Sequence, residues 1–389
     1  MAGKQINPKL IQALTNQSIT DIPSSPTFKH LGGTYVKSVV DQIKKFDTPY
    51  DKNEMMLTCK QCGHSGKYNI GIMAIDISDK GQHKSQQFTG YFRCQHCNTG
   101  GQWEDSAELY LLGISALMTS NEQLPVHFGE IQLFDGTSPK YATDGEEHLL
   151  NLISTSPKSG LLWNKLGNIY LTGSRPELAM AAFEKSIELD PNQIESHLSI
   201  ANLLMPIKNY QRASQHLHHM MMTAHTYKYA EATHLRELLA HGLCTSFIAA
   251  TESKNKYTAL PTQQQLIAAG STINLESHGL PEWLQLSSED LTSFYPLAEL
   301  FMGERTLELK GTIKKNKPQK ITKSQQVQAF IDAQQSLFTK ADIQNACPNV
   351  SAATINRVVN ELRKKDIIEM VGLGRNVQWR KKFDSRYHD

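Results

Sequence analysis

Four cysteines of this 389-residue chain are arranged in two pairs of identical spacing. Cys59-x2-Cys62 lies within CKQCGHSG, and Cys94-x2-Cys97 lies within YFRCQHCNTGGQW. Thiols at this spacing can form a metal knuckle, a redox pair or half of a disulfide framework. Tetrahedral zinc needs four ligands at about 2.3 Å, which two such turns supply together, whereas a redox pair needs only one turn. The paired spacing therefore predicts one structural Zn2+ ion held by all four thiolates.

The composition sets the context for this site. With 39% hydrophobic and 20% charged residues, the chain is typical of a soluble globular protein, and its length indicates two or three domains. The first residues contain no apolar stretch long enough for a secretory signal, and no apolar run approaches a membrane helix in length. We therefore expect a cytoplasmic protein without membrane contacts, whose thiols stay reduced, which weakens the disulfide interpretation. The net charge of +2 means that any basic surface must be local.

The segment between the cysteine pairs indicates how the metal is positioned. Residues 67–77 and 88–93 are rich in β-branched and aromatic residues and flank a polar stretch with a central glycine, so we expect a long β-hairpin. With this hairpin, residues 51–103 resemble a zinc ribbon. Zinc ribbons occur in nucleic-acid machinery and also as purely structural clips, so the resemblance implies zinc and leaves nucleic-acid contact open. We expect His64 and His96 in exposed loops, because four cysteines already complete the metal shell.

The middle of the chain carries a repeat pattern. Residues at W-x2-L-G-x2-Y, A-x3-F and P spacing are Trp163, Leu166, Gly167, Tyr170, Ala179, Phe183 and Pro191. This segment resembles a tetratricopeptide repeat. One repeat length later the pattern recurs without aromatic residues, at Ile200, Ala201, Leu204, Ala213 and Leu217. Small residues at Gly167 and Ala179 predict two antiparallel helices in close contact.

We assign residues 104–309 to a helical domain around these repeats. A solenoid core needs about three repeats, so residues 104–118 and 226–249 are candidate flanking helices. Tetratricopeptide repeats form a groove for peptide segments or helices, so the resemblance implies a protein or peptide partner. Asn168 and Asn202 occupy a repeat position that lines the groove in this family, where an amide can bind a partner's backbone. The alternative is that both are helix-surface residues without a ligand.

Other candidate reactive groups have simpler interpretations. Cys244 and Cys347 each lie in an apolar helical pattern, which predicts small core residues. The histidines of HLHHM, residues 216–220, have no carboxylate or cysteine at ligand spacing, so we interpret them as a polar helix face. Phosphate-loop, H-E-x2-H and G-x-S-x-G patterns are missing from the sequence. We therefore expect a protein that is not an enzyme.

The C-terminal part begins with a lysine-rich stretch, residues 310–322, which contains no acidic residue and is expected to be a basic linker. A first helix follows with Val327, Phe330 and Ile331 on one face. The next two helices begin at Thr339, which can form a capping box with Asp342, and at Ser351. Two short strands around GLGRN end the pattern. In this order, residues 323–389 resemble a winged helix-turn-helix domain.

This resemblance implies duplex DNA as a partner, with one helix in the major groove and the hairpin along the backbone. The candidate base-reading residues on the outer face of that helix are Thr354, Asn356, Arg357 and Asn360. Arginine and asparagine pair with guanine and adenine edges. Candidate phosphate contacts on the hairpin are Arg375, Arg380, Lys381 and Lys382. Two alternatives stay open, since some winged helices bind proteins and these charges can be ordinary solvated groups.

The sequence thus predicts a mainly α fold with small β elements. It comprises an N-terminal helical segment of unknown role at 1–50, a zinc ribbon, helical repeats, a basic linker and a winged helix. The preferred function is a DNA-binding transcription regulator whose repeats recruit a protein or form a homodimer. The alternative is an adaptor or scaffold subunit of a nucleic-acid-processing or defence complex, acting through its repeats.

Overall fold

The structure is a computed structural model. It describes residues 5–46, 53–77, 83–118, 125–270, 273, 286–309, 323–332, 337–348, 350–365, 367–371 and 378–381. The chain is mainly helical with small sheets. It divides into two compact units, Met1–Thr306 and Leu307–Asp389. The N-terminal, cysteine-containing and repeat segments that the sequence distinguishes all fall in the first unit.

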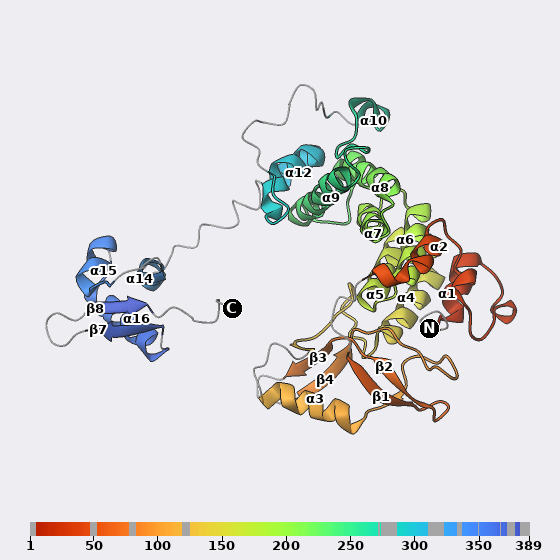
Figure 1. Cartoon of the computed structure of the whole chain (residues 1–389), viewed down its shortest axis with the longest axis horizontal. Helices are drawn as coiled ribbons and strands as arrows, with labels where there is room; N and C mark the ends of the chain where they lie inside the picture. Colours follow the sequence, from red (N-terminus) through yellow and green to blue (C-terminus); the bar gives the residue numbers. More distant parts are fainter. Residues whose placement is uncertain are drawn as a thin grey trace. The chain divides into compact units, whose positions relative to one another are not determined.

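Antiparallel helices that pack in chain order make up the larger part of the first unit (Figure 1). They are α4 (Ala142–Thr155), α5 (Gly160–Thr172), α6 (Pro176–Leu189), α7 (Ile194–Leu204), α8 (Tyr210–Thr223), α9 (Ala232–Glu252) and α12 (Tyr295–Met302). Trp163, Tyr170 and Phe183 are buried between them. A Cβ atom added to Gly167 would lie 2.4 Å from a Phe183 ring carbon. The close approach of α5 and α6 that the repeat pattern predicts is therefore present.

The helices α5, α7 and α9 end in the same turn. In each, a residue with positive φ precedes a residue whose backbone N–H donates to the carbonyl five positions earlier. After α5, Ser174 has positive φ and Arg175 donates to the Tyr170 carbonyl. After α7, Lys208 has positive φ and Asn209 donates to the Leu204 carbonyl. After α9, Lys254 has positive φ and Asn255 donates to the Ala250 carbonyl. Because α9 ends as the first helix of each preceding pair does, it begins a further pair, which is completed by α12. The helix expected at 226–249 thus extends the repeat array.

The cysteines lie in a region of two small sheets. One sheet has the order β2-β1-β5, formed by β1 (Glu54–Cys59), β2 (Ser65–Asn69) and β5 (Trp103–Glu104). The other has the order β4-β3-β6, formed by β3 (Met73–Ile77), β4 (His83–Phe88) and β6 (Val126–Phe128). The helix α3 (Ala107–Met118) packs on these sheets, with Gly113 near Met73 and Ile75. Residues 104–118 therefore support the sheets and do not flank the repeats.

The prediction of a strand at 88–93 is wrong. The strand that pairs with β3 is β4, at residues 83–88. The following segment has no regular structure. Its aromatic residues Tyr91 and Phe92 are buried. A Cβ atom on Gly90 would lie 2.4 Å from the Asn69 carbonyl oxygen, so only glycine allows the chain to pass there. The aromatic composition reflects burial of this segment against its neighbours instead of strand pairing.

The N-terminal segment lies along the second helices of the pairs. Its helices are α1 (Pro8–Thr15), which packs on α4, and α2 (Val36–Asp41), which packs on α6. The Glu184 carboxylate of α6 accepts hydrogen bonds from the backbone N–H groups of Thr34 and Tyr35, at 2.7 and 3.1 Å. The Tyr35 ring then contacts His216 of α8 edge-on. This segment is therefore an integral part of the first unit.

The second unit contains α14 (Lys323–Asp332), α15 (Lys340–Ala346), α16 (Ala352–Lys364) and the antiparallel hairpin β7 (Ile368–Val371) and β8 (Gln378–Lys381). Thr339 and Asp342 form the predicted capping box, and Ser351 caps α16. Phe338 exchanges two backbone hydrogen bonds with Trp379 of β8, at 3.0 and 2.7 Å. This bridge joins the start of α15 to the hairpin. The buried residues that form the core of this unit include Val327, Ile331, Phe338, Ile343, Cys347, Val358, Val359, Leu362 and Trp379.

Candidate metal centre and binding surfaces

Each cysteine pair lies on a turn with the same backbone pattern. The N–H of the first cysteine donates to the carbonyl five residues later, and its carbonyl accepts from the N–H four residues later. Cys59 donates to the His64 carbonyl and accepts from the Gly63 N–H. Cys94 donates to the Thr99 carbonyl and accepts from the Asn98 N–H. All four distances are 2.8 to 2.9 Å. Gly63 and Asn98 both have positive φ, at 71° and 59°. Both residue types tolerate this conformation.

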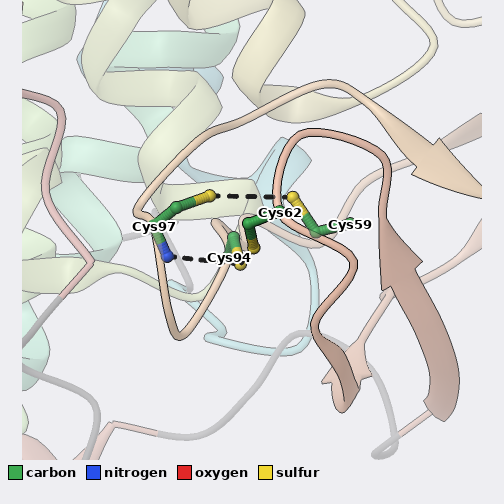
Figure 2. Close-up of side chains that lie close together, drawn as sticks. All are labelled: Cys59, Cys62, Cys94 and Cys97. Atoms are coloured by element: carbon green, nitrogen blue, oxygen red, sulfur yellow. Dashed lines mark hydrogen bonds between the residues drawn. The ribbon is translucent and has the colours of Figure 1, made fainter.

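The two turns bring the four thiols together (Figure 2). The Sγ atoms of Cys59 and Cys97 are 3.7 Å apart, and those of Cys62 and Cys94 are 3.6 Å apart. All four sulfur atoms lie within 4.8 Å of one another. A disulfide would need a separation of about 2.05 Å, whereas a zinc tetrahedron with ligands at about 2.3 Å has edges of about 3.8 Å. The four cysteines could therefore hold a metal ion.

The surroundings favour a thiolate at one of these positions, Cys97. Burial raises the pKa of Cys59, and, against a backbone hydrogen bond at His64, burial and the neighbouring thiols raise the pKa of Cys62 to about 12. Although burial opposes the effect, hydrogen bonds from Thr99 and the neighbouring thiols lower the pKa of Cys97 to about 6. Thiolate is the form that binds metals. The rings of His64 and His96 stack with their centroids 5.8 Å apart, and they lie outside the four-sulfur group. His96 is exposed and His64 partly exposed.

A buried carboxylate fixes the cysteine region against the repeats. Glu146 of α4 is fully buried and accepts hydrogen bonds from Tyr91 (2.9 Å) and Tyr170 (2.7 Å). It also accepts from Arg93 (2.8 Å) and Asn7 (3.0 Å). Burial, and then the Glu146 charge, raise the pKa of both tyrosines, so both stay hydrogen-bond donors. One side chain thus joins the N-terminal segment, the cysteine region and α5. Nothing in the sequence analysis identified it.

Asn98 connects the second cysteine turn to the N-terminal segment. Its side-chain amide donates to the carbonyls of Ile6 and Ser24, at 2.8 and 2.9 Å. Its own carbonyl accepts from the Arg93 guanidinium at 2.8 Å. The first cysteine turn has a glycine at the equivalent position, Gly63. The two side-chain hydrogen bonds, which glycine cannot form, explain the asparagine in the second turn.

The histidines of HLHHM do not form the polar helix face that their sequence suggested. His218 is buried and bonds to the Thr258 carbonyl, and His216 Nδ1 lies 2.9 Å from His197 Nδ1. His197 and His219 both contact the Pro191 carbonyl. Burial, with repulsion from neighbouring cations, lowers the pKa of His197 to about 3 and of His216 to about 4. The imidazoles of His197 and His216 are therefore neutral at physiological pH and act as packing and hydrogen-bonding groups.

The two asparagines of the repeats lie on the first helices of successive pairs, α5 and α7, and are both exposed. Asn202 of α7 accepts a hydrogen bond from Thr245 of α9 at 3.3 Å. Asn168 of α5 has no hydrogen-bond partner in the described part of the chain, and it lines a cavity of about 240 Å3. Between them, Lys165 and Glu195 form an ion pair at 3.0 Å. Polar side chains therefore connect α5 to α7 and α7 to α9.

In the second unit, Asn356, Arg357 and Asn360 are exposed on α16, and Thr354 is partly exposed. The Arg357 guanidinium donates to the Ser324 hydroxyl at 2.7 Å. It also lies 4.0 Å from the carboxylate of Glu361.

The hairpin residues are placed only in part. Arg380 pairs with Glu369 directly across the hairpin, at 2.5 Å. Lys381 ends β8, whereas Arg375, Lys382 and the linker 310–322 lie outside the described residues. Of the two isolated cysteines, Cys347 is in the core as predicted, whereas Cys244 of α9 is only partly buried.

Comparison with known families identifies one segment. A tetratricopeptide repeat model matches residues 161–193, which cover α5, α6 and the turn before α7. No curated protein and no solved structure matches the chain. None of the described helices has the combination of length and apolar character that a bilayer-spanning segment requires. The chain therefore contains a tetratricopeptide repeat, a motif that commonly mediates protein interactions, together with four cysteines that could bind a metal.

Proposed function

We propose that the chain is a non-catalytic regulatory protein that brings a protein partner to duplex DNA. In this proposal the surface of α5, α7 and α9 binds the partner, a structural Zn2+ ion holds the zinc-ribbon region, and the second unit is a winged helix that contacts DNA. The observation that carries the protein-binding part is the repeat match together with the exposed, repeat-related Asn168 and Asn202. The N-terminal segment covers the second helices of the pairs, which leaves the first helices as the available face.

The DNA-binding part is supported by the second unit. The order of its helices agrees with a winged helix-turn-helix arrangement. The capped helix α16 takes the place of the recognition helix, and α14 and the hairpin pack against it. Exposed Asn356, Arg357 and Asn360 provide donors of the kind that read base edges. The Arg357 contact with Ser324 is between exposed groups, so DNA can replace it at little cost.

One observation favours the alternative function, an adaptor whose second unit docks on protein. Arg380 is engaged by Glu369, so the described part of the hairpin offers less free positive charge than the sequence suggested. Duplex DNA binding separates the two functions directly.

We expect the full chain to enrich a short sequence from random duplex DNA, with affinity that falls as salt rises. Arg357→Ala should weaken binding by about 1 to 3 kcal/mol and relax selectivity at one base pair, because a bidentate base contact is lost. Arg363→Ala, in the last turn of the same helix, is the matched control and should leave selectivity unchanged. Replacing Arg375 or Lys381 should weaken all sequences alike and reduce the salt slope by about 1. Titrations at two salt concentrations measure each effect. If no duplex shows salt-dependent binding, the adaptor function replaces this one.

We also expect the double variant Asn168→Ala, Asn202→Ala to weaken binding of a protein partner by about 1 to 3 kcal/mol, because buried backbone groups of the partner lose their hydrogen bonds. Asn192→Ala changes an exposed asparagine in the turn before α7 and serves as the control. Affinity for partners captured by the full chain can be measured by calorimetry. Unchanged affinity of the double variant for every captured partner would rule out the assigned face.

A further inference from the structure

The cavity beside Asn168 has walls that do not belong to the repeats. One wall is formed by α4 and α5, including Leu149 and Ile169, and the opposite wall by Phe88 and the loop at residues 131–139, including Ile131 and Leu133. We call this cavity the end pocket, because it lies at α4 and α5, where the array of packed helices begins. A non-repeat loop thus closes the end of the α5, α7 and α9 surface and turns it into a defined pocket.

The loop wall is held in place by buried polar contacts. The Gln87 side chain is 4% exposed and donates to the carbonyls of Ile131 and Pro139, at 2.7 and 2.9 Å. Its amide oxygen accepts from the Ile131 N–H at 2.7 Å. At the far side of the loop, Asp135 pairs with His148 of α4 at 2.6 Å. These contacts fix both ends of the loop, so the pocket exists before any ligand binds.

The charge of the lining selects an uncharged occupant. Lys165 is the charged residue among those that line the pocket, and Glu195 already neutralises it at 3.0 Å. The Glu195 carboxylate is also held by the Tyr227 hydroxyl at 3.0 Å. An acidic or basic ligand group would therefore lose its hydration without gaining a counter-charge.

The size of the pocket points to a single side chain. Its volume of about 240 Å3 lies below the roughly 300 to 1,000 Å3 typical of small-molecule sites. Asn168 supplies one amide donor and one amide acceptor beside the apolar lining. An apolar lining beside one amide group suits a peptide residue whose apolar side chain enters the pocket while its backbone bonds to Asn168.

We propose that the end pocket binds one aromatic or large aliphatic side chain of an extended peptide segment of the partner protein, while Asn168 holds the adjacent backbone. This inference rests on the proposed protein-binding function and names the residue class that the partner presents. The segment continues from the pocket along the surface that carries Asn202. Charged residues are excluded from the position that enters the pocket.

Selection of displayed random peptides on the full chain tests this inference. We expect the enriched peptides to share one aromatic or large aliphatic position. Leu133→Asp places a charge in the loop wall and should lower the affinity for these peptides about ten- to hundredfold. This is the effect of losing the burial of one apolar side chain. Ile19→Asp, an exposed isoleucine of the N-terminal segment outside the pocket and outside α5, α7 and α9, is the control and should change affinity less than twofold.

Two further outcomes distinguish the possible failures. If Asn202→Ala lowers the affinity for the enriched peptides but Leu133→Asp leaves it unchanged, the end pocket is overturned and the protein-binding function stays in place. The pocket assignment would also be overturned by a shared charged residue at the position that Leu133→Asp affects. If no peptide is enriched, both the binding function and the pocket occupant are wrong.

Discussion

Cys62→Ser should abolish stoichiometric zinc binding and unfold the cysteine region, whereas the unaltered chain should hold one zinc ion. Cys62 is exposed, so its replacement removes a ligand without disturbing the core. Structural zinc contributes about 10 to 16 kcal/mol of binding free energy in small zinc domains, and binding is coupled to folding. Because Asn98 and Arg93 connect this region to Ile6 and Glu146, protection of the N-terminal segment should fall as well. Elemental analysis gives the metal content, and amide hydrogen exchange locates the unfolding.

Cys244→Ser is the matched control, since this partly buried thiol lies on α9, away from the four-sulfur group. It should keep full zinc content. His64→Ala should also keep it, because the histidine lies outside the group of ligands. Freshly purified, reduced protein without zinc would disprove the metal assignment. A chelator that removes zinc without changing hydrogen exchange would disprove the coupling to folding.

Glu146→Ala should destabilise the first unit by about 3 to 5 kcal/mol. The substitution leaves the buried Arg93 guanidinium without its carboxylate and deprives two buried tyrosine hydroxyls of their acceptor. Breaking a buried ion pair from one side costs this much because an uncompensated charge stays in the interior. The shift in the midpoint of chemical denaturation, with hydrogen exchange at α4 and α5 as the probe of the first unit, measures the effect.

The neighbouring residue provides a matched control. Glu147 also forms an ion pair, with Lys9 at 2.6 Å, and accepts a hydrogen bond from Asn7 at 2.9 Å, but the side chains of Lys9 and Glu147 are 53% and 37% exposed. Glu147→Ala should cost less than about 1 kcal/mol, the usual range for surface pairs. Similar effects of the two substitutions would show that the Glu146 contacts do not hold the segments together.

These adjacent glutamates show where prediction from the sequence ends. In DGEEHLLNLI they are chemically identical neighbours, yet one accepts four hydrogen bonds in the interior, whereas the other is partly exposed and bonds to Lys9 and Asn7. The partners of Glu146 are as far away in the sequence as Asn7, so no local pattern marks it. The same holds for His197 and His216, whose burial depends on how α7 and α8 meet.

Features governed by local rules were predictable. The capping box at Thr339 depends on residues three positions apart, and the close contact at Gly167 follows from a fixed repeat spacing. The paired cysteine turns belong to the same class, since each one closes within six residues of chain. The prediction of a strand at 88–93 failed because Tyr91 contacts Tyr170 of the repeats and Phe92 packs in the core of the cysteine region. Composition alone does not separate such burial from strand formation.

The N-terminal segment also sets an order of events during synthesis. Tyr35 contacts His216, which is 181 residues later in the chain, and Gln5 contacts Arg175. At about 5 to 20 residues per second, the ribosome needs roughly 10 to 40 s to produce these partners after the segment itself has emerged. Until α4 has emerged, Leu10 and Ile11, which are fully buried in the finished unit, lack the helix on which α1 packs. Docking of the N-terminal segment therefore follows the emergence of α4, α6 and α8.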